Sequence, residues 1–300
     1  MARSVYERDP AFRAMFDMCA DCCALPLRRL VFAGEEAVLG RTDVTQPAMF
    51  VIECALTAML NSWGLRPDVT LGHSIGEYAA AYAAGMITAE EGCRLVLERG
   101  RLMRERCERS ALVAVSGSEA DLVRLLAAHP GLEIAIQNTS RSVVVGGSCH
   151  AAERFCAAAA AAKRPVRTLA VSHAFHTRFM DPMLRSFGLA TEAIGVRRTR
   201  GVAFISAAAG EELDRVDGRY WVQHVRGPVR FAQALHSLAD CMPEVVIEVG
   251  PGRTLVGLAR SELGKDVAGA WLTLLSPRED EWGAVTSAAE VLKATGAIEV

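Results

Sequence analysis

Apolar positions along the first 65 residues recur at helical spacing. From Phe12 to Cys19 they fall at i, i+3, i+4 and i+7, so residues 6–24 are predicted to form a helix. Residues 25–42 follow neither the helical nor the strand period and are expected to be irregular. The apolar pattern that resumes after them predicts a second helix, which ends near Trp63.

The second helix has start signals of its own. Thr45 can accept a hydrogen bond as a cap, and Pro47 suits a first turn because its missing N–H would have no partner there. A third, longer helix is predicted over Ala89–Glu108, and it carries five arginines.

The pattern changes near Ser110, where short strands and helices alternate. Their order is strand, helix, strand, strand, helix, strand, which is the split arrangement of a ferredoxin-like (βαββαβ) module. The predicted elements are 111–117, 119–128, 132–138, 142–147, 150–163 and 165–171. We therefore expect a large α/β core made of residues 1–109 and 173–300, and a small inserted subdomain of residues 110–172.

Beyond the insert, apolar runs and helical stretches alternate again. Val245–Val249 is apolar except for Glu248 and precedes a Gly-Pro-Gly turn, a pattern that favours a strand in a sheet covered on both faces. Further strands are expected at 201–207 and 271–275, and a closing helix at 281–295.

One short stretch combines a strand, a sharp turn and a helix around a serine. Pro67–Leu71 is mostly apolar, Ser74 is flanked by Gly72 and Gly76, and an alanine-rich stretch follows from Tyr78. This is the layout of a nucleophile elbow, in which glycines relieve crowding and the hydroxyl projects from the turn. The start of the following helix directs N–H groups at an anion forming on a reacting carbonyl. Ser74 is therefore a candidate nucleophile.

A serine hydroxyl is a weak nucleophile at neutral pH, so it needs a base. Among the seven histidines, His173 and His176 follow the last strand of the insert at a strand-to-loop edge, a common place for site residues. His73 is adjacent to the serine and points elsewhere from the turn. His224 is possible but lies near a polar loop.

Composition narrows the class of protein. The 300 residues are 51% hydrophobic and 23% charged with a net charge of −2, which indicates neither nucleic acid nor a membrane surface as a partner. No apolar run is long enough to span a bilayer, and the charged N-terminus does not look like a signal peptide. We expect a cytoplasmic protein with nine reduced cysteines. Cys19, Cys22 and Cys23 lack a matching second ligand pair, so no metal site is expected.

Several motifs spread over residues 45–260 occur together in one order. They are Thr45-Gln46-Pro47-Ala48, Gly72-His73-Ser74-Ile75-Gly76-Glu77, Glu98-Arg99-Gly100-Arg101-Leu102-Met103, Asn138 ahead of Val143-Val144-Val145-Gly146-Gly147, His173-Ala174-Phe175-His176, Gly227-Pro228-Val229-Arg230-Phe231 and Glu248-Val249-Gly250-Pro251-Gly252. With them the chain resembles the acyltransferase domains of polyketide synthases and the related malonyl-CoA:acyl carrier protein transacylases. The family fold, a hydrolase-like α/β core on a parallel sheet with an inserted ferredoxin-like subdomain, agrees with the insert predicted above.

The resemblance implies roles for the residues around the serine. Ser74 would be the nucleophile and His176 its base, with the backbone N–H of Ile75 as an oxyanion-hole donor and Gln46 lining the site. The family orients the imidazole mainly through backbone carbonyls, and the loop before Pro228 is where one is expected.

Arg99 also has a chemical argument of its own, because a planar guanidinium can hold an acyl carboxylate through two hydrogen bonds. The alternative is one more surface charge on an arginine-rich helix. The resemblance favours the carboxylate clamp, and it implies that His73, Met103, His173 and Phe175 line the acyl pocket. In this family His-Ala-Phe-His accompanies malonyl selectivity. The expected reason is steric, because the phenylalanine fills the space of an α-methyl group, a difference worth ~1–3 kcal/mol.

The implied reaction moves a malonyl group from malonyl-CoA, through a Ser74 ester, to the phosphopantetheine thiol of an acyl carrier protein in polyketide or fatty acid biosynthesis. Malonyl-CoA is a substrate in this scheme, and no tightly bound cofactor is expected. The expected partners are the acyl carrier protein and other domains or subunits of a synthase.

One family feature has no counterpart in this sequence. Members usually begin with a strand and a Gly-Gln-Gly-type loop that supplies a second oxyanion N–H, whereas Met1-Ala2-Arg3 leads straight into a predicted helix. Either the sequence is shortened relative to the working protein, or the strand and its donor are lacking. The second case would lower the rate by ~10²–10³.

Three other functions stay open. An acyl-thioester hydrolase would use the same serine, although an uncharged acyl chain has no use for Arg99. A weakly active scaffold that binds a carrier protein would follow from the lacking strand. A generic serine esterase needs an acid between Ser74 and His176 in chain order. If a carboxylate orients the base, Asp181 and Glu248 are the nearest candidates.

Overall fold

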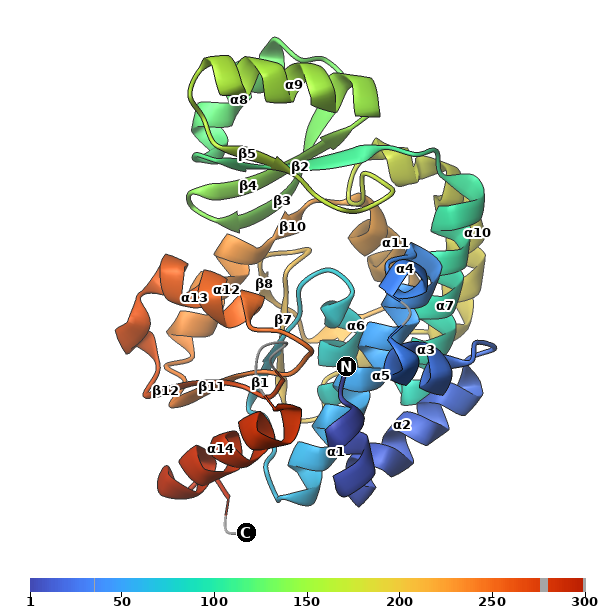
Figure 1. The fold of residues 1–300 in the computed structure, drawn as a ribbon, viewed down its shortest axis with the longest axis vertical. Helices are drawn as coiled ribbons and strands as arrows, with labels where there is room; N and C mark the ends of the chain where they lie inside the picture. The colour runs from blue at the N-terminus through green and yellow to red at the C-terminus, as the bar shows by residue number, and fades with distance from the viewer. Residues whose placement is uncertain (35, 276–279, 299–300) are drawn as a thin grey trace.

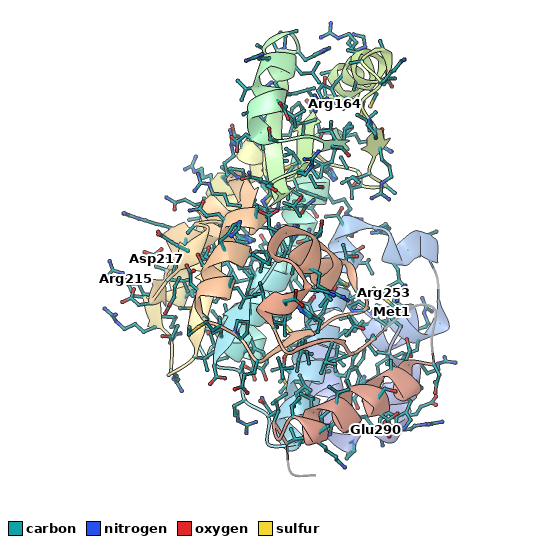
Figure 2. The ribbon with its side chains drawn as sticks, turned by 90° about the vertical axis from the view of Figure 1, so that its left-hand side faces the viewer. Met1, Arg164, Arg215, Asp217, Arg253 and Glu290 are labelled. Atoms are coloured by element: carbon teal, nitrogen blue, oxygen red, sulfur yellow. The ribbon has the colours of Figure 1, made fainter. Side chains whose placement is uncertain are left out.

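Two lobes make up the computed structural model, which describes residues 1–34, 36–275 and 280–298 (Figure 1). The predicted core range 173–300 includes residues 276–279 and 299–300, which lie outside the described part. The small lobe is at the top of Figure 1 and the larger lobe lies below it. Figure 2 views the same arrangement from the side, with Arg164 in the small lobe and Glu290 at the far end of the large one.

The predicted first helix is two helices, α1 (Arg3–Arg8) and α2 (Pro10–Cys22). The break comes at Asp9, whose side chain accepts a hydrogen bond of 2.7 Å from the Phe12 N–H and caps α2. Pro10 follows at the first position, where its missing N–H has no intrahelical partner to lose. The prediction of one continuous helix over 6–24 was therefore wrong at this point.

Residues 25–42 are not irregular, which corrects a second prediction. They contain α3 (Leu27–Ala33) and the one-turn helix α4 (Glu36–Leu39). Leu27, Leu30 and Val31 are buried on one side of α3. A helix of seven residues presents only one such group of apolar positions, too few for a periodic pattern to be recognised.

The long helix α5 (Thr42–Ser62) begins three residues before the predicted cap. Arg41 is the residue that precedes it, and the Thr45 hydroxyl donates to the Arg41 carbonyl over 2.9 Å instead of capping the N-terminus. The helix is buried on most sides because it packs between α2 and α7 (Ala89–Arg106).

A short parallel pair of strands forms the centre of the large lobe. β1 (Val69–Leu71) pairs with β7 (Ala203–Ser206), and β7 pairs in turn with the antiparallel β8 (Glu211–Glu212). The helix α6 (Gly76–Ala83) follows β1 directly, as the elbow pattern predicts. A minor antiparallel pair, β6 (Arg197–Arg198) with β9 (Arg215–Val216), lies beyond it.

The small lobe has the predicted βαββαβ order. Its elements are β2 (Ala111–Ser116), α8 (Glu119–Ala127), β3 (Leu132–Thr139), β4 (Ser142–Gly147), α9 (Cys149–Ala161) and β5 (Val166–Thr168). The four strands are antiparallel in the order β3-β4-β2-β5, and both helices lie on the outer face of the sheet (Figure 1). This is the ferredoxin-like arrangement.

A fifth strand connects the two lobes. β10 (Val229–Arg230) comes from the core sequence and pairs in parallel with β3, with Val229 opposite Ile136. It follows α11 (Gly218–Arg226) and leads into α12 (Phe231–Asp240). The chain leaving the insert forms the short helix η1 (Arg178–Met180) and then α10 (Asp181–Thr191). Segments on both sides of the lobe boundary are thereby fixed to one another.

The last strands form a separate parallel pair, β11 (Val245–Glu248) with β12 (Ala270–Thr273). All four residues of β11 are half-buried, so the prediction of a strand covered on both faces was wrong. The free side of β11 borders a largely apolar cavity of about 780 Å³, and β1 borders the same cavity. The helices α13 (Thr254–Leu263) and α14 (Glu281–Ala294) complete the lobe.

Candidate active site

The turn between β1 and α6 projects Ser74. Gly72 allows it, because a Cβ at this position would lie 2.3 Å from the backbone of Glu77. Ser74 itself has a φ of 52°, in the left-handed region that non-glycine residues rarely adopt. Such strain persists only where the surrounding structure holds it, and it is common at functional sites.

His176 lies next to this serine, 102 residues further along the chain. Its Nε2 is 2.7 Å from Ser74 Oγ, and its Nδ1 is 3.1 Å from the carbonyl oxygens of both His224 and Gly227. Carbonyls only accept, so Nδ1 carries the proton and Nε2 has a free lone pair for the serine hydroxyl. His176 also has a positive φ, 61°.

No carboxylate among the described residues contacts this imidazole. Asp181 accepts a 2.6 Å bond from Arg226, and Glu248 accepts a 2.8 Å bond from the N–H of Val256. Neither of the two acids considered from the sequence therefore reaches the base. The carbonyl of Gly227 lies in the loop before Pro228, where the resemblance implies an orienting carbonyl.

The environment of His176 keeps its imidazole neutral. Burial is the main cause, followed by the positive charge of Arg99, and together they lower the pKa of His176 to about 3. A neutral imidazole can accept a proton, so the pair is in the form that a general base requires.

Ile75 follows the serine at the start of α6. The next two N–H groups are used within the turn, since Gly76 donates to the His73 carbonyl over 3.1 Å and Glu77 to the Ser74 carbonyl over 3.0 Å. Within the described residues the Ile75 N–H has no such partner. It is therefore available to an oxyanion formed at Ser74.

Arg99 is a buried cation with few partners. Its side chain is 2% exposed, and one terminal nitrogen donates to Gln46 Oε1 over 2.5 Å. Among the described residues its Nε and Nη2 have no hydrogen-bond partner, and no carboxylate there forms an ion pair with it. The amide of Gln46 is held by a 3.2 Å contact to Met103 Sδ. An unpaired buried charge is costly, so this geometry favours an anionic ligand.

The other residues predicted to line the acyl pocket have no side-chain hydrogen bond to the Ser74–His176 pair among the described residues. His73 Nε2 is 2.9 Å from Asn138 Oδ1 on β3, which connects the elbow to the small lobe. His173 Nδ1 is 2.7 Å from Ser172 Oγ, and its ring centroid is 6.1 Å from that of Phe175. Phe175 is half-buried between the two apolar clusters of the core. Among the described residues, no hydrogen bond joins the side chain of any of the three to Ser74.

His224 is the site residue that sequence reasoning undervalued. It lies on α11 with 1% exposure, and its Nε2 is 3.1 Å from the Ser74 carbonyl. A buried carboxylate, Glu77, lies 3.9 Å from the same nitrogen. The signal was present, because Trp221, His224 and Val225 share one face of a helix at i, i+3 and i+4, and all three are buried.

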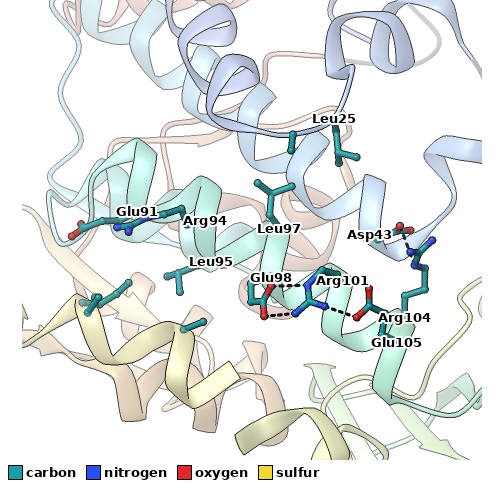
Figure 3. A pocket seen from close by; sticks show the side chains of 14 residues that line it. Leu25, Asp43, Glu91, Arg94, Leu95, Leu97, Glu98, Arg101, Arg104 and Glu105 are labelled. Atoms are coloured by element: carbon teal, nitrogen blue, oxygen red, sulfur yellow. Dashed lines mark hydrogen bonds and ion pairs between the residues drawn. The ribbon is translucent and has the colours of Figure 1, made fainter. Parts of the chain in front are cut away.

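A separate groove of about 620 Å³ lies on the outer side of α7 (Figure 3). Arg101 forms ion pairs there with Glu98 and Glu105, and Arg104 with Asp43. None of the predicted site residues lines this groove, so it is distinct from the serine site. Arg101 and Arg104 are exposed and paired with carboxylates, which distinguishes them from the buried Arg99 on the same helix.

The described residues offer neither a metal site nor a membrane-spanning helix. In the described ranges no group of three or more His, Cys, Asp or Glu side chains could hold a metal ion. Across the same ranges no helix has both the length and the hydropathy required to cross a membrane. Cys19 and Cys23 are buried and Cys22 is exposed, and all nine cysteines are free.

The large lobe, with a serine at a strand-to-helix turn, and its ferredoxin-like insert together define a hydrolase-like α/β protein. The chain belongs to the acyl transferase domain family, whose pattern matches residues 1–278. The resemblance inferred from the motifs is thereby confirmed, and so is the fold class.

The chain matches a small part of much longer polyketide synthases. The chain is 37% identical over 305 residues to a phenolphthiocerol synthesis polyketide synthase type I of Mycobacterium marinum, an alignment that covers 99% of this chain but 14% of the synthase. The acyltransferase domain from the second module of the salinomycin polyketide synthase superposes with a TM-score of 0.92 at 36% identity, covering 98% of this chain and 69% of that one.

A transacylase shares the fold as well. The malonyl CoA-acyl carrier protein transacylase of Clostridium perfringens gives a TM-score of 0.88 at 22% identity and covers 99% of this chain and 94% of that one. At that identity the similarity concerns the fold alone.

Proposed function

We propose that this acyltransferase moves a malonyl group from malonyl-CoA to the phosphopantetheine thiol of an acyl carrier protein, through an ester on Ser74. The observation that carries the proposal is Arg99, a buried guanidinium whose Nε and Nη2 have no partner in the described structure. Two free donors on one planar group suit the two oxygens of a carboxylate. Malonyl bears such a carboxylate at the end away from its thioester.

In the first step, Ser74 Oγ attacks the thioester carbonyl while His176 Nε2 takes the hydroxyl proton. The 2.7 Å contact supports this transfer, and the two carbonyls on Nδ1 hold the required tautomer. The Ile75 N–H stabilises the oxyanion. The carbon–sulfur bond then breaks, and His176 returns its proton to the CoA sulfur.

The second step reverses these roles with a different thiol. The carrier's thiol gives its proton to His176 as its sulfur attacks the malonyl ester, and the carbon–oxygen bond to Ser74 breaks. The serine oxygen regains the proton from His176. Throughout both steps Arg99 holds the malonyl carboxylate, so the reacting carbonyl stays in place and the carboxylate is not free to leave as CO₂.

The names of the relatives support the setting. Phenolphthiocerol and salinomycin synthases are polyketide synthases, so we assign this chain to polyketide assembly with a carrier protein as partner. Nine free thiols fit the reducing cytoplasm, where we place the reaction. The unpartnered donors of Arg99 favour this reading over a hydrolase for uncharged acyl chains.

Transfer and hydrolysis can be separated directly. The protein is loaded with malonyl-CoA, freed of CoA, and then given pantetheine or buffer, and the malonyl group is followed by mass spectrometry. We expect malonyl-pantetheine to form faster than free malonate. Malonate as the main product in both samples would indicate a hydrolase, and no loading at all would indicate a scaffold.

A further inference from the structure

His224 contacts both halves of the Ser–His pair through different atoms. Its imidazole Nε2 is 3.1 Å from the carbonyl oxygen of Ser74, and its own backbone carbonyl is 3.1 Å from His176 Nδ1. We propose that His224 is a positioning residue: its side chain holds the peptide between Ser74 and Ile75, so that the Ile75 N–H points at the oxyanion.

The proton on His224 can be placed from its partners. The Ser74 carbonyl accepts and cannot donate, so Nε2 of His224 carries the hydrogen. Nδ1 has no partner among the described side chains and backbone groups. Burial, with the charge of Arg99 as the next cause, lowers the pKa of His224 well below its usual range, so the ring is neutral with a single N–H.

The N–H of His224 donates to the peptide group between Ser74 and Ile75, which is rigid. A peptide group is planar and trans, so the Ser74 carbonyl and the Ile75 N–H point in opposite directions along one plane. A donor on the oxygen therefore fixes the direction of the N–H on the other side. It also polarises the peptide, which strengthens that N–H as a donor.

The peptide needs such a restraint because its first residue is strained. Ser74 has a φ of 52°, and relaxation toward negative φ would rotate this plane. The Glu77 N–H also donates to the Ser74 carbonyl, over 3.0 Å, as part of the α6 turn. The His224 bond adds a second restraint from a different element, which the helix alone does not supply.

The ring of His224 is itself held in place. Tyr78 meets it edge to face at 5.3 Å between centroids, and Trp221 at 5.9 Å. Glu77 lies 3.9 Å from Nε2, and its carboxylate accepts hydrogen bonds from Ser206 and the Ala207 N–H, each 3.0 Å long. The imidazole therefore has a fixed direction in the absence of substrate.

Two amide substitutions form a matched test. Glutamine at 224 places its NH₂ near the position of Nε2, whereas asparagine reaches only as far as Nδ1. We expect His224→Asn to slow acylation of Ser74 by roughly 10- to 100-fold, somewhat below the ~10²–10³ for outright loss of an oxyanion donor. His224→Gln is expected to recover most of that rate, with kcat rather than KM carrying the difference.

The readout should not depend on malonyl, because the inference rests on the proposed role of Ser74. A fluorophosphonate probe serves, since Ser74 Oγ bonds to phosphorus, fluoride leaves and the proton passes to His176. If the wild type reacts with the probe but does not load malonyl, the proposed substrate is wrong, and the role of His224 can still be tested. His236→Asn, on an exposed histidine paired with Glu262, is the control variant.

Equal labelling of the wild type and both variants would overturn the inference. Equal loss in both variants would also overturn it, because packing rather than the Nε2 donor would then be responsible. If both variants fail to fold, nitrogen NMR of labelled histidine in the wild type decides. Protonation of His224 at Nδ1 instead of Nε2 would contradict the proposed bond.

Discussion

The candidate site has a serine end, Ser74 with His176, and an arginine end, Arg99, and the two differ in how many of their polar groups have hydrogen-bond partners. At the serine end, Ser74 Oγ and both ring nitrogens of His176 have hydrogen-bond partners. At the other end, Arg99 is as buried as His176, yet two of its donor groups have no partner among the described residues. A catalytic pair whose hydrogen bonds are already made keeps its geometry without substrate. A buried cation without partners is stabilised most when an anion binds to it. In the proposed function, the serine end supplies the reactivity and the arginine end the selectivity for a carboxylate.

Removing the nucleophile should have the largest effect. Ser74→Ala is expected to abolish the malonyl adduct and to lower turnover by roughly 10⁶, as for other enzymes that lose a nucleophile of this kind. Intact-mass measurement after incubation with malonyl-CoA checks it. An adduct of unchanged yield on the alanine variant would move the nucleophile elsewhere and remove the basis of the comparison.

Removing the Arg99 cation should impair recognition of the acyl group while leaving the Ser74–His176 pair in place. Arg99→Ala is expected to lower kcat/KM for malonyl loading by roughly 10²- to 10⁴-fold, because breaking a buried pair costs about 3–5 kcal/mol and each factor of ten corresponds to about 1.36 kcal/mol. Acetyl loading, which needs no cation, should fall much less. Arg101→Ala is the matched control on the same helix, since Arg101 is exposed and paired with Glu98 and Glu105. A similar loss for acetyl and malonyl would argue against a carboxylate clamp.

The pH profile tests whether the two ends influence each other. With its pKa lowered to about 3, His176 loses its basic form only when the pH falls near that value. The acid limb of kcat/KM for acetyl loading should therefore lie well below the usual histidine value of about 6.5. In Arg99→Gln the pKa of His176 rises, so the limb moves to higher pH. Rates measured from about pH 2.5 to 8, with only brief exposure at the acid end, test this shift, and an unmoved limb would mean that Arg99 does not act on the base.

The smallest expected effect concerns the choice of acyl group. Replacing Phe175 with serine should raise the methylmalonyl-to-malonyl ratio by roughly ten-fold, since one methyl group is worth only ~1–3 kcal/mol. The ratio is measured in one reaction with both CoA esters in competition. Thermal unfolding of the variant serves as the control for Phe175 packing. If the ratio does not change, selectivity depends on residues other than Phe175.

Local patterns in the sequence predicted the elements around the serine and the insert well. The elbow, α6 and the six elements of the small lobe agree with the structure to within a few residues, because each is defined by its own periodicity and turns. The short helices α3 and α4 were missed because they are below the length at which periodicity is visible. The separation of β11 from β1 is set by non-local pairing, which no local pattern encodes.

The same distinction applies to the site. Five arginines lie on one predicted helix, and the motif alone favoured Arg99. Its burial was nevertheless encoded, because Leu95, Val96, Leu102 and Met103 place it on the apolar face at i±3 and i±4. The two carbonyls at His176 Nδ1 could not be found as side-chain chemistry, because any residue type presents a carbonyl.

The two-residue strand β10 has a consequence for how the lobes communicate. It is paired with β3 of the small lobe, and only Pro228 separates it from Gly227, whose carbonyl holds His176. A tilt of the small sheet therefore displaces the acceptor that aligns the base. The binding of a partner that fixes the small lobe in one orientation is therefore coupled in free energy to the alignment of His176. The coupling is reciprocal. If the partner changes the affinity for a ligand at Ser74 by some factor, that ligand changes the affinity for the partner by the same factor.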